Sequence, residues 1–187
     1  MQNKYCMLLG NNFDDIEGIT VINILRRSDI SLDIFSVSQN TVSSFTGMTY
    51  LINNVFNFLE DISTEEYDGI LLPGGRGVLE LAKNTEVISL VRKFYDEGKL
   101  VFGICGAPII LDKAGALDGK KYTCLPSVVS MIHSGNCIDE KVVVDSNVVT
   151  SKALGTSMDA ALKLVEVIKS KEKAMVTADR YYIERKT

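Results

Sequence analysis

The stretch Leu100-Val-Phe-Gly-Ile-Cys-Gly-Ala-Pro-Ile-Ile-Leu111 decides the fold. It begins with a short apolar run, residues 100–104, which predicts a buried strand. Pro108 then opens a second apolar run of helical length, and proline is tolerated in the first turn of a helix because its missing N–H would have no partner there. A strand that passes directly into a helix, with Gly103 and Gly106 around Cys105, predicts a sharp turn like the nucleophile elbow of serine hydrolases.

Cys105 at this elbow is interpreted as a reactive thiol. The unpaired N–H groups and the dipole at a helix N-terminus favour negative charge, so they would stabilise a thiolate and lower the pKa of the thiol. The alternative is a buried cysteine that behaves as a small hydrophobic residue, which is the commoner role. The two glycines and the helix-opening proline favour the reactive interpretation.

Outward from the elbow, short apolar runs alternate with helical patterns. Strands are expected at 5–9, 30–37, 68–72 and 100–104, helices at about 14–27, 85–97 and 157–168, and a hairpin at 142–150. Residues 38–44 are expected to form a loop, and residues 50–58 fit a strand or a helix equally well. Such alternation predicts an α/β fold with a mostly parallel sheet and helices on both faces. The length fits a single domain over residues 1–187.

Ligands bind to parallel sheets of this kind beyond the carboxyl ends of the strands. Three predicted turns lie there: one after Leu9, one after Leu72, and the elbow itself. We therefore expect Glu17, Gly74, Gly75 and Cys105 to converge, although the acidic residue could be an ordinary solvated side chain and the glycines only a tight turn.

Composition excludes several classes of function. A formal net charge of −4 argues against binding to nucleic acid or to an anionic membrane, because such partners are attracted by basic surfaces. No apolar run approaches the roughly 18 residues that span a bilayer, and the first residues are too weakly apolar for a secretory signal, so a cytoplasmic protein is expected. One histidine and four cysteines without a Cys-x-x-Cys pair argue against a metal site or a disulfide framework. The glycine-rich turn 73–77 matches neither phosphate-binding motif, so no cofactor is expected.

The first helix is unusual because apolar residues surround most of its circumference. They are Ile16, Ile19, Val21, Ile22, Ile24 and Leu25. An ordinary surface helix has one apolar stripe, so this helix should be covered on two sides. A homodimer through the helix between Glu17 and Arg27 is the expectation.

Three segments together identify a family: Leu71–Gly75, Gly103–Pro108 and Thr150–Ser157. The chain resembles the ThiJ/PfpI superfamily, and most closely its branch of the parkinsonism-associated protein deglycase. The resemblance implies a flavodoxin-like three-layer sandwich and a homodimer. It also implies a cysteine elbow with a glutamate from the first helix beside it.

By this resemblance Cys105 corresponds to the reactive cysteine and Glu17 to the glutamate that hydrogen-bonds it. The backbone N–H groups of Gly75 and Gly106, with Gly74 in the same turn, correspond to an oxyanion pocket. A protonated carboxyl can donate to sulfur, and paired N–H groups can hold a developing oxyanion, so the chemistry is reasonable for these residue types.

The chain also departs from the family. Leu125 stands where the deglycase branch has a histidine before a proline, and the only histidine, His133, comes eight residues later. A glycine, Gly106, follows Cys105 where the related proteases carry histidine, so peptidase activity is not expected. Glutamine amidotransferases need a later His-x-Glu, which is absent.

Two functions remain open at this point, and with them the question whether the chain is an enzyme. The first is a stress-response protein that senses oxidants by reversible oxidation of a Cys105 thiolate, with Glu17 donating to the added oxygen. The alternative is a cofactor-independent glyoxalase or deglycase that takes methylglyoxal-type carbonyls as hemithioacetals on Cys105. A chaperone-like dimer is a third, weaker hypothesis.

Overall fold

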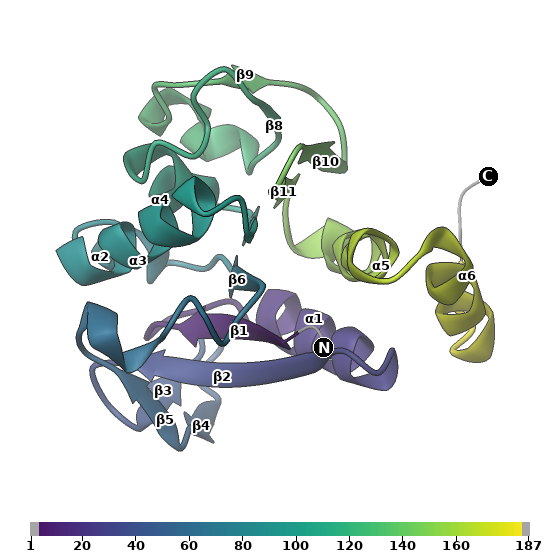
Figure 1. Ribbon diagram of the computed structural model, residues 1–187, viewed down its shortest axis with the longest axis horizontal. Coiled ribbons are helices and arrows are strands. Elements are labelled where there is room, and N and C mark those ends of the chain that lie inside the picture. Colours follow the sequence, from purple (N-terminus) through teal and green to yellow (C-terminus); the bar gives the residue numbers. More distant parts are fainter. Residues whose placement is uncertain (1–3, 185–187) are drawn as a thin grey trace.

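The computed structural model describes residues 4–184, and a seven-stranded sheet forms its centre (Figure 1). The strand order is β10-β11-β7-β6-β1-β2-β5, and every pair is parallel except β10 with β11. The strands are β1 (Lys4–Leu9), β2 (Ser31–Val37), β5 (Asn54–Phe56), β6 (Gly69–Leu72), β7 (Leu100–Ile104), β10 (Val142–Asp145) and β11 (Val148–Ser151). The predicted mostly parallel sheet is confirmed, and β10 and β11 form the expected hairpin.

Helices cover both faces of the sheet (Figure 1). One face carries α1 (Asp15–Arg27), α5 (Ser157–Ile168) and α6 (Lys171–Arg180), and the other carries α2 (Val78–Leu81), α3 (Thr85–Asp96) and α4 (Pro108–Lys113). Side chains of a strand alternate between faces, so Met7 packs in the core beneath α1 and α5 while Leu8 packs in the core beneath α3 and α4. The result is the predicted three-layer α/β sandwich.

Smaller elements lie around the sheet. β3 (Thr41–Ser43) pairs with β4 (Thr49–Leu51), β8 (Lys121–Tyr122) pairs with β9 (Asn136–Cys137), and 3-10 turns form at Leu59–Asp61, Pro126–Met131 and Leu154–Thr156. The expected loop at 38–44 is partly wrong, because β3 lies within it and its Val42 is fully buried. Residues 50–58, left open between helix and strand, form the end of β4 and all of β5.

The turns after β1, β6 and β7 lie side by side because these three strands are neighbours in the sheet. The N–H of Asp14 donates to the carbonyl of Gly74 at 2.9 Å, which joins the first turn to the second. Asp14 is also the N-cap of α1, since its carboxylate accepts from the N–H of Glu17 at 3.1 Å. This cap fixes where α1 begins and sets its first turn beside the other two turns.

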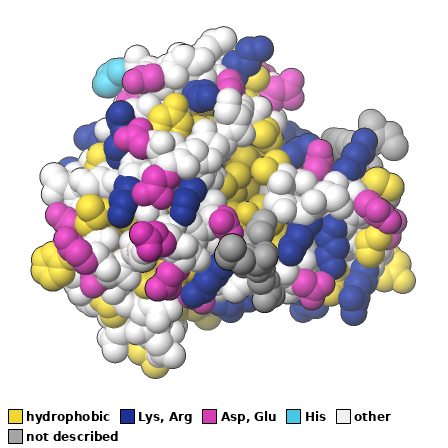
Figure 2. All heavy atoms as spheres, viewed as in Figure 1, with side chains coloured by type: hydrophobic (Ala, Val, Ile, Leu, Met, Phe, Trp, Pro, Cys, Tyr) yellow, Lys and Arg dark blue, Asp and Glu magenta, His cyan; other side chains and the backbone are white. Residues whose placement is uncertain are grey.

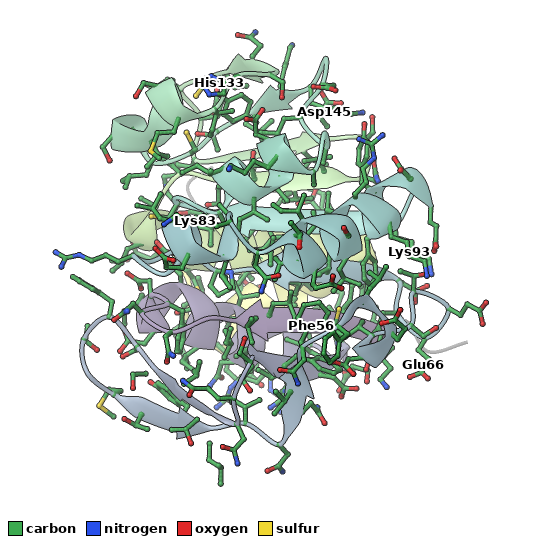
Figure 3. All side chains as sticks on the ribbon, turned by 90° about the vertical axis from the view of Figure 1, so that its left-hand side faces the viewer. Phe56, Glu66, Lys83, Lys93, His133 and Asp145 are labelled. Carbon is green, nitrogen blue, oxygen red and sulfur yellow. The ribbon has the colours of Figure 1, made fainter. Side chains whose placement is uncertain are left out.

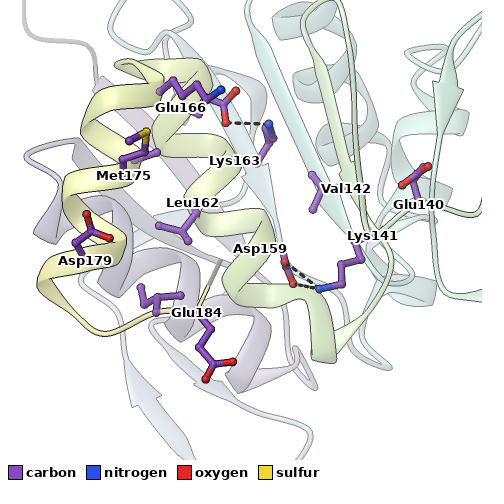
Figure 4. Close-up of a pocket in the computed structure, with 13 residues that line it drawn as sticks. Glu140, Lys141, Val142, Asp159, Leu162, Lys163, Glu166, Met175, Asp179 and Glu184 are labelled. Atoms are coloured by element: carbon purple, nitrogen blue, oxygen red, sulfur yellow. Dashed lines mark hydrogen bonds and ion pairs between the residues drawn. The ribbon is translucent and has the colours of Figure 1, made fainter. Parts of the chain in front are cut away.

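A surface hollow of about 810 Å³ lies away from these turns, between the edge strand β10 and the helices α5 and α6 (Figure 4). Charged side chains line much of it, including the ion pairs Lys141–Asp159 and Lys163–Glu166. None of the four cysteines is among the residues that line it. Within the described chain, no helix combines the length and apolarity needed to cross a bilayer.

Candidate active site

Cys105 lies at the turn between β7 and α4, as the sequence predicts. Its φ is +63°, in the left-handed region that residues other than glycine rarely adopt. Its N–H donates to the carbonyl of Ser151 at 2.9 Å, and Pro108 opens α4 three residues later. A Cβ at Gly103 would lie 3.2 Å from the side chain of Leu111, so the missing side chain lets the helix turn back closely onto the strand. The side chain of Cys105 is half-buried.

Glu17 reaches Cys105 from the first turn of α1 and is fully buried. Its Oε2 accepts a hydrogen bond of 2.8 Å from the N–H of Gly74. Its Oε1 is the only buried side-chain nitrogen or oxygen without a hydrogen-bond partner in the part of the chain that the structure describes. The carboxyl also interacts with the thiol of Cys105. Oε1 is therefore available to exchange a proton with the sulfur or to bind a group added to it.

Burial and the nearby charge of Asp14 raise the pKa of Glu17 to about 7, while the thiol and the N–H of Gly74 act in the opposite direction. The carboxyl thus holds its proton up to neutral pH. Such a group can act as an acid or a base under physiological conditions.

The prediction of a low pKa for the Cys105 thiol is wrong for the folded protein, where the thiol lies beside Glu17. Burial, followed by the charge of Glu17, raises the pKa of the thiol to about 12. The N–H groups of Gly75 and Gly106 lower it, as the sequence argument anticipated, but their effect is smaller. Desolvation disfavours the thiolate, and it depends on the packed surroundings of the thiol, which the local sequence does not show.

The three glycines of the predicted pocket divide into two roles. The N–H groups of Gly75 and Gly106 point to the sulfur of Cys105, which suits them to an oxyanion. The N–H of Gly74 is used by Glu17, so it positions the carboxyl. A Cβ at Gly74 would lie 2.5 Å from Glu17 Oε2 and 2.6 Å from the Cβ of Cys105, so only glycine fits between them.

A cavity of about 320 Å³ opens beside Cys105, Gly75 and Gly106. Most of its lining is apolar and comes from α2, α4 and the turn after β8, including Leu79, Ile109, Leu125, Val128 and Met131. Its volume suits a small molecule, and its apolar walls suit a compound that carries little charge.

Leu125 lines this cavity, and its N–H donates to the carbonyl of Cys105 at 2.9 Å. Leu125, at the position where the resemblance implies a histidine, therefore lies beside the elbow. His133 is not among the residues that line the cavity, and its side chain is exposed toward the top of Figures 2 and 3. Its backbone N–H donates to Asp112 at 3.2 Å.

Phe45 and Arg76 also line the cavity, and neither is among the site residues that the sequence predicts. The guanidinium of Arg76 lies 4.4 Å from the centre of the Phe45 ring at the edge of the cavity. Arg76 was detectable, since it directly follows Gly75 in the glycine-rich turn. Phe45 was not, because the β3–β4 hairpin carries it to the site from a segment without a clear strand pattern.

Comparison with known proteins agrees with this geometry. The family model described as the DJ-1/PfpI family matches residues 3–167. A deglycase from Pyrococcus horikoshii is 34% identical over 151 residues, which are 80% of this chain and 89% of that protein. The DJ-1 homolog A of Arabidopsis thaliana is 33% identical over 164 residues, 87% of this chain but only 41% of that protein, so the chain spans less than half of this longer relative.

Solved structures show the same fold. The DJ-1beta protein of Drosophila melanogaster superposes with a TM-score of 0.91 at 27% identity, covering 99% of this chain and 100% of that one. A DJ-1 superfamily protein of Salmonella typhimurium gives 0.90 at 28% identity, with 98% and 100% covered. Sequence and fold agree over nearly the whole length, so the chain belongs to the DJ-1/PfpI family.

Proposed function

We propose that the protein acts on small reactive carbonyl compounds of the methylglyoxal type, as a cofactor-independent glyoxalase or deglycase with Cys105 as nucleophile. The observation that carries this proposal is the pairing of the Cys105 thiol with a buried carboxyl, Glu17, whose pKa is about 7. A thiol that keeps its proton needs a base at the moment of attack, and a carboxyl with this pKa is a suitable one. The similar protein of Pyrococcus horikoshii is named a deglycase, which supports the same chemistry.

In the proposed first step, the sulfur of Cys105 attacks the aldehyde carbon and a C–S bond forms. The thiol proton passes to the Glu17 carboxylate, and the carbonyl electron pair moves to oxygen. The N–H groups of Gly75 and Gly106 hold that oxyanion, and Glu17 then returns the proton to it, which gives a neutral hemithioacetal. Conversion of methylglyoxal to lactate adds one water overall and needs no oxidant.

Lactate formation from methylglyoxal tests the proposal. We expect turnover in the wild type that rises with pH through about 7, because Glu17 must be ionised to accept the proton. Cys105→Ser and Glu17→Gln should lose at least ~100-fold in rate, the usual range for a missing nucleophile or base. Cys137→Ser, which removes another half-buried thiol, is the matched control and should keep the rate. Turnover that survives in Cys105→Ser would reject the proposal.

Oxidant sensing at Cys105 is the second candidate, and it is supported by the unpartnered Oε1 of Glu17. When protonated, this carboxyl can donate to an oxygen added to sulfur and stabilise a sulfenic or sulfinic acid. Mass spectrometry of peroxide-treated protein distinguishes this candidate: added oxygen on Cys105 in wild type, and less of it in Glu17→Ala, would favour a sensor over a carbonyl enzyme if no lactate forms.

We further propose a homodimer through α1. Val21, Ile24 and Leu25 of this helix are buried within the protomer, in the core shared with α5. Ile16 is 51% exposed, and Ile19 is only half-buried. One side of the apolar circumference is therefore already covered, and the side that carries Ile16 is the surface offered to a second copy.

The proposed place of action is the cytoplasm. All four cysteines are free thiols in the structure, and none is paired in a structural disulfide. Free thiols are typical of a reducing compartment, where glutathione and thioredoxin keep them reduced. Carbonyl chemistry on a cysteine also requires the thiol to stay reduced.

A further inference from the structure

Two further thiols, Cys124 and Cys137, lie in the segment next to the elbow, since Cys124 directly precedes Leu125, whose N–H donates to the carbonyl of Cys105. Strands β8 and β9 pair in parallel, and their register sets Tyr122 opposite Cys137. The N–H of Ile138 donates to the carbonyl of Tyr122 at 2.8 Å and holds this register. Cys124 follows Tyr122 by two positions, just beyond the end of β8, and two positions is the spacing at which side chains share one face of a strand.

The two thiols are neighbours in the fold. Cys137 packs against the core cluster that contains Cys124 and Tyr122. Burial raises the pKa of the Cys124 thiol and of the Tyr122 hydroxyl, and Cys137 raises both further. Cys124 is buried, with 2% of its surface exposed, whereas Cys137 is half-buried and open to small reagents. No cluster of three or more metal-ligating side chains occurs among residues 4–184, so the pair is not part of such a cluster.

We propose that Cys124 and Cys137 form a reversible disulfide on exposure to a hydroperoxide, and so constitute a redox site separate from Cys105. This inference is independent of the proposed carbonyl chemistry. In the first step the sulfur of Cys137 attacks the peroxide oxygen and the O–O bond breaks; Cys137 becomes a sulfenic acid and the peroxide is reduced to an alcohol or water. The sulfur of Cys124 then attacks that of Cys137, an S–S bond forms, the S–O bond breaks, and water leaves with the proton of the Cys124 thiol.

The order of the steps follows from the surroundings. Cys137 is the thiol that a peroxide can reach. Burial raises the pKa of Cys124 to about 12, which makes it the poorer first nucleophile but leaves it well placed against the sulfenic acid beside it. A thiol reductant of sufficiently low potential reverses the bond by thiol–disulfide exchange.

The disulfide would close a loop that includes part of the cavity wall. Leu125, Val128 and Met131 all lie between the two cysteines and line the cavity next to Cys105. Leu125 is bonded through its N–H to the carbonyl of Cys105. Oxidation of the pair would therefore restrain the same segment that shapes the cavity.

Peptide mass spectrometry of wild-type protein tests the proposal directly. Trypsin releases residues 122–141 as one peptide with both cysteines, and residues 100–113 as another with Cys105. After treatment with hydrogen peroxide and then an alkylating reagent, we expect peptide 122–141 to have lost two hydrogen atoms and to carry no label. Reduction before alkylation should restore it with two labels. Peptide 100–113 reports separately on Cys105.

Cys137→Ser is the variant for comparison, because a hydroxyl at this position cannot form the bond and the position is only half-buried. Its peptide 122–141 should take one label at Cys124 whether or not peroxide was added. Three results would overturn the proposal: two labels on the wild-type peptide after peroxide, oxygen added to Cys137 while Cys124 remains free, or a disulfide between two chains on a non-reducing gel. Because the wild type gives a complete result, the conclusion stands even if the variant folds poorly.

Discussion

The N–H of Gly74 donates a 2.8 Å hydrogen bond to Oε2 of Glu17, a residue 57 positions earlier in the chain. This bond ties the turn after β6 to the first turn of α1. It occupies one carboxyl oxygen and leaves the other for the thiol of Cys105. The backbone thus holds Glu17 in one orientation, and the fold determines which of its two carboxyl oxygens is free to act on the thiol.

Glu17→Gln should change how stability depends on pH. The pKa of Glu17 is about 7 in the folded protein and 4.5 in its ordinary state, so between these values the folded protein binds the extra proton. Stability therefore falls as pH rises through this window and levels off above it. The total amounts to about 3 kcal/mol, since one pKa unit is about 1.36 kcal/mol. Denaturant unfolding across the window should show this loss in wild type and not in Glu17→Gln, and equal slopes in both would contradict the assignment.

Leu125→His should make Cys105 more reactive near neutral pH. Leu125 lines the cavity beside the elbow, so an imidazole there can take the thiol proton and stabilise the thiolate as imidazolium. We expect the rate of iodoacetamide alkylation at Cys105 to rise about 10-fold, which corresponds to a pKa lower by about one unit. Leu125→Gln, of similar size but without a titrating group, is the control. If both variants react alike, the effect is one of access and not of proton transfer.

Gly74→Ala should damage both stability and the site. The new Cβ would lie 2.5 Å from Glu17 Oε2 and 2.6 Å from the Cβ of Cys105, so the two residues must separate. Overpacking of this kind costs about 1–3 kcal/mol of unfolding free energy. Gly155→Ala, where nothing lies within 4 Å of the new Cβ, is the matched control and should have little effect. Thermal unfolding measures both, and a Gly74→Ala protein as stable as the control would show that the site can relax.

Ile16→Glu should weaken the proposed dimer without unfolding the protomer. Ile16 is 51% exposed on α1, so a charge there meets water in the monomer and an apolar surface in the dimer. Val176→Glu, at a position 55% exposed on α6, is the control. Light scattering should find monomers for Ile16→Glu and dimers for wild type and Val176→Glu. A dimer that survives Ile16→Glu would place the interface elsewhere.

Much of the fold follows from short-range patterns. Apolar runs and helix-opening residues located β1, β6, β7, α1, α3 and α5, and the order of parallel strands brought their turns together. α6 was missed because its sequence is charged and weakly periodic; its position depends on the Ser170 cap and on contacts with α5.

The sequence predicts which residues meet at the candidate site, but it does not predict the pKa of the Cys105 thiol there. Cys105, Glu17 and the glycines occupy sequence positions with recognisable neighbours. The raised pKa of the thiol depends on how completely the packed chain excludes water around it, and no local pattern encodes that. Phe45 likewise reaches the cavity only through the pairing of β3 with β4, which involves segments without a clear strand pattern.

At Cys105, the residue type that the proposed chemistry requires differs from the residue type that the left-handed backbone favours. A non-glycine residue with φ near +63° costs roughly 1–2 kcal/mol, which glycine would not. Cys105→Gly should accordingly unfold at a higher temperature than wild type while losing all chemistry at the elbow. Selection of variants for thermal stability alone would therefore tend to remove the sulfur, so any stabilised form of this protein must be screened for its thiol as well as for its melting temperature.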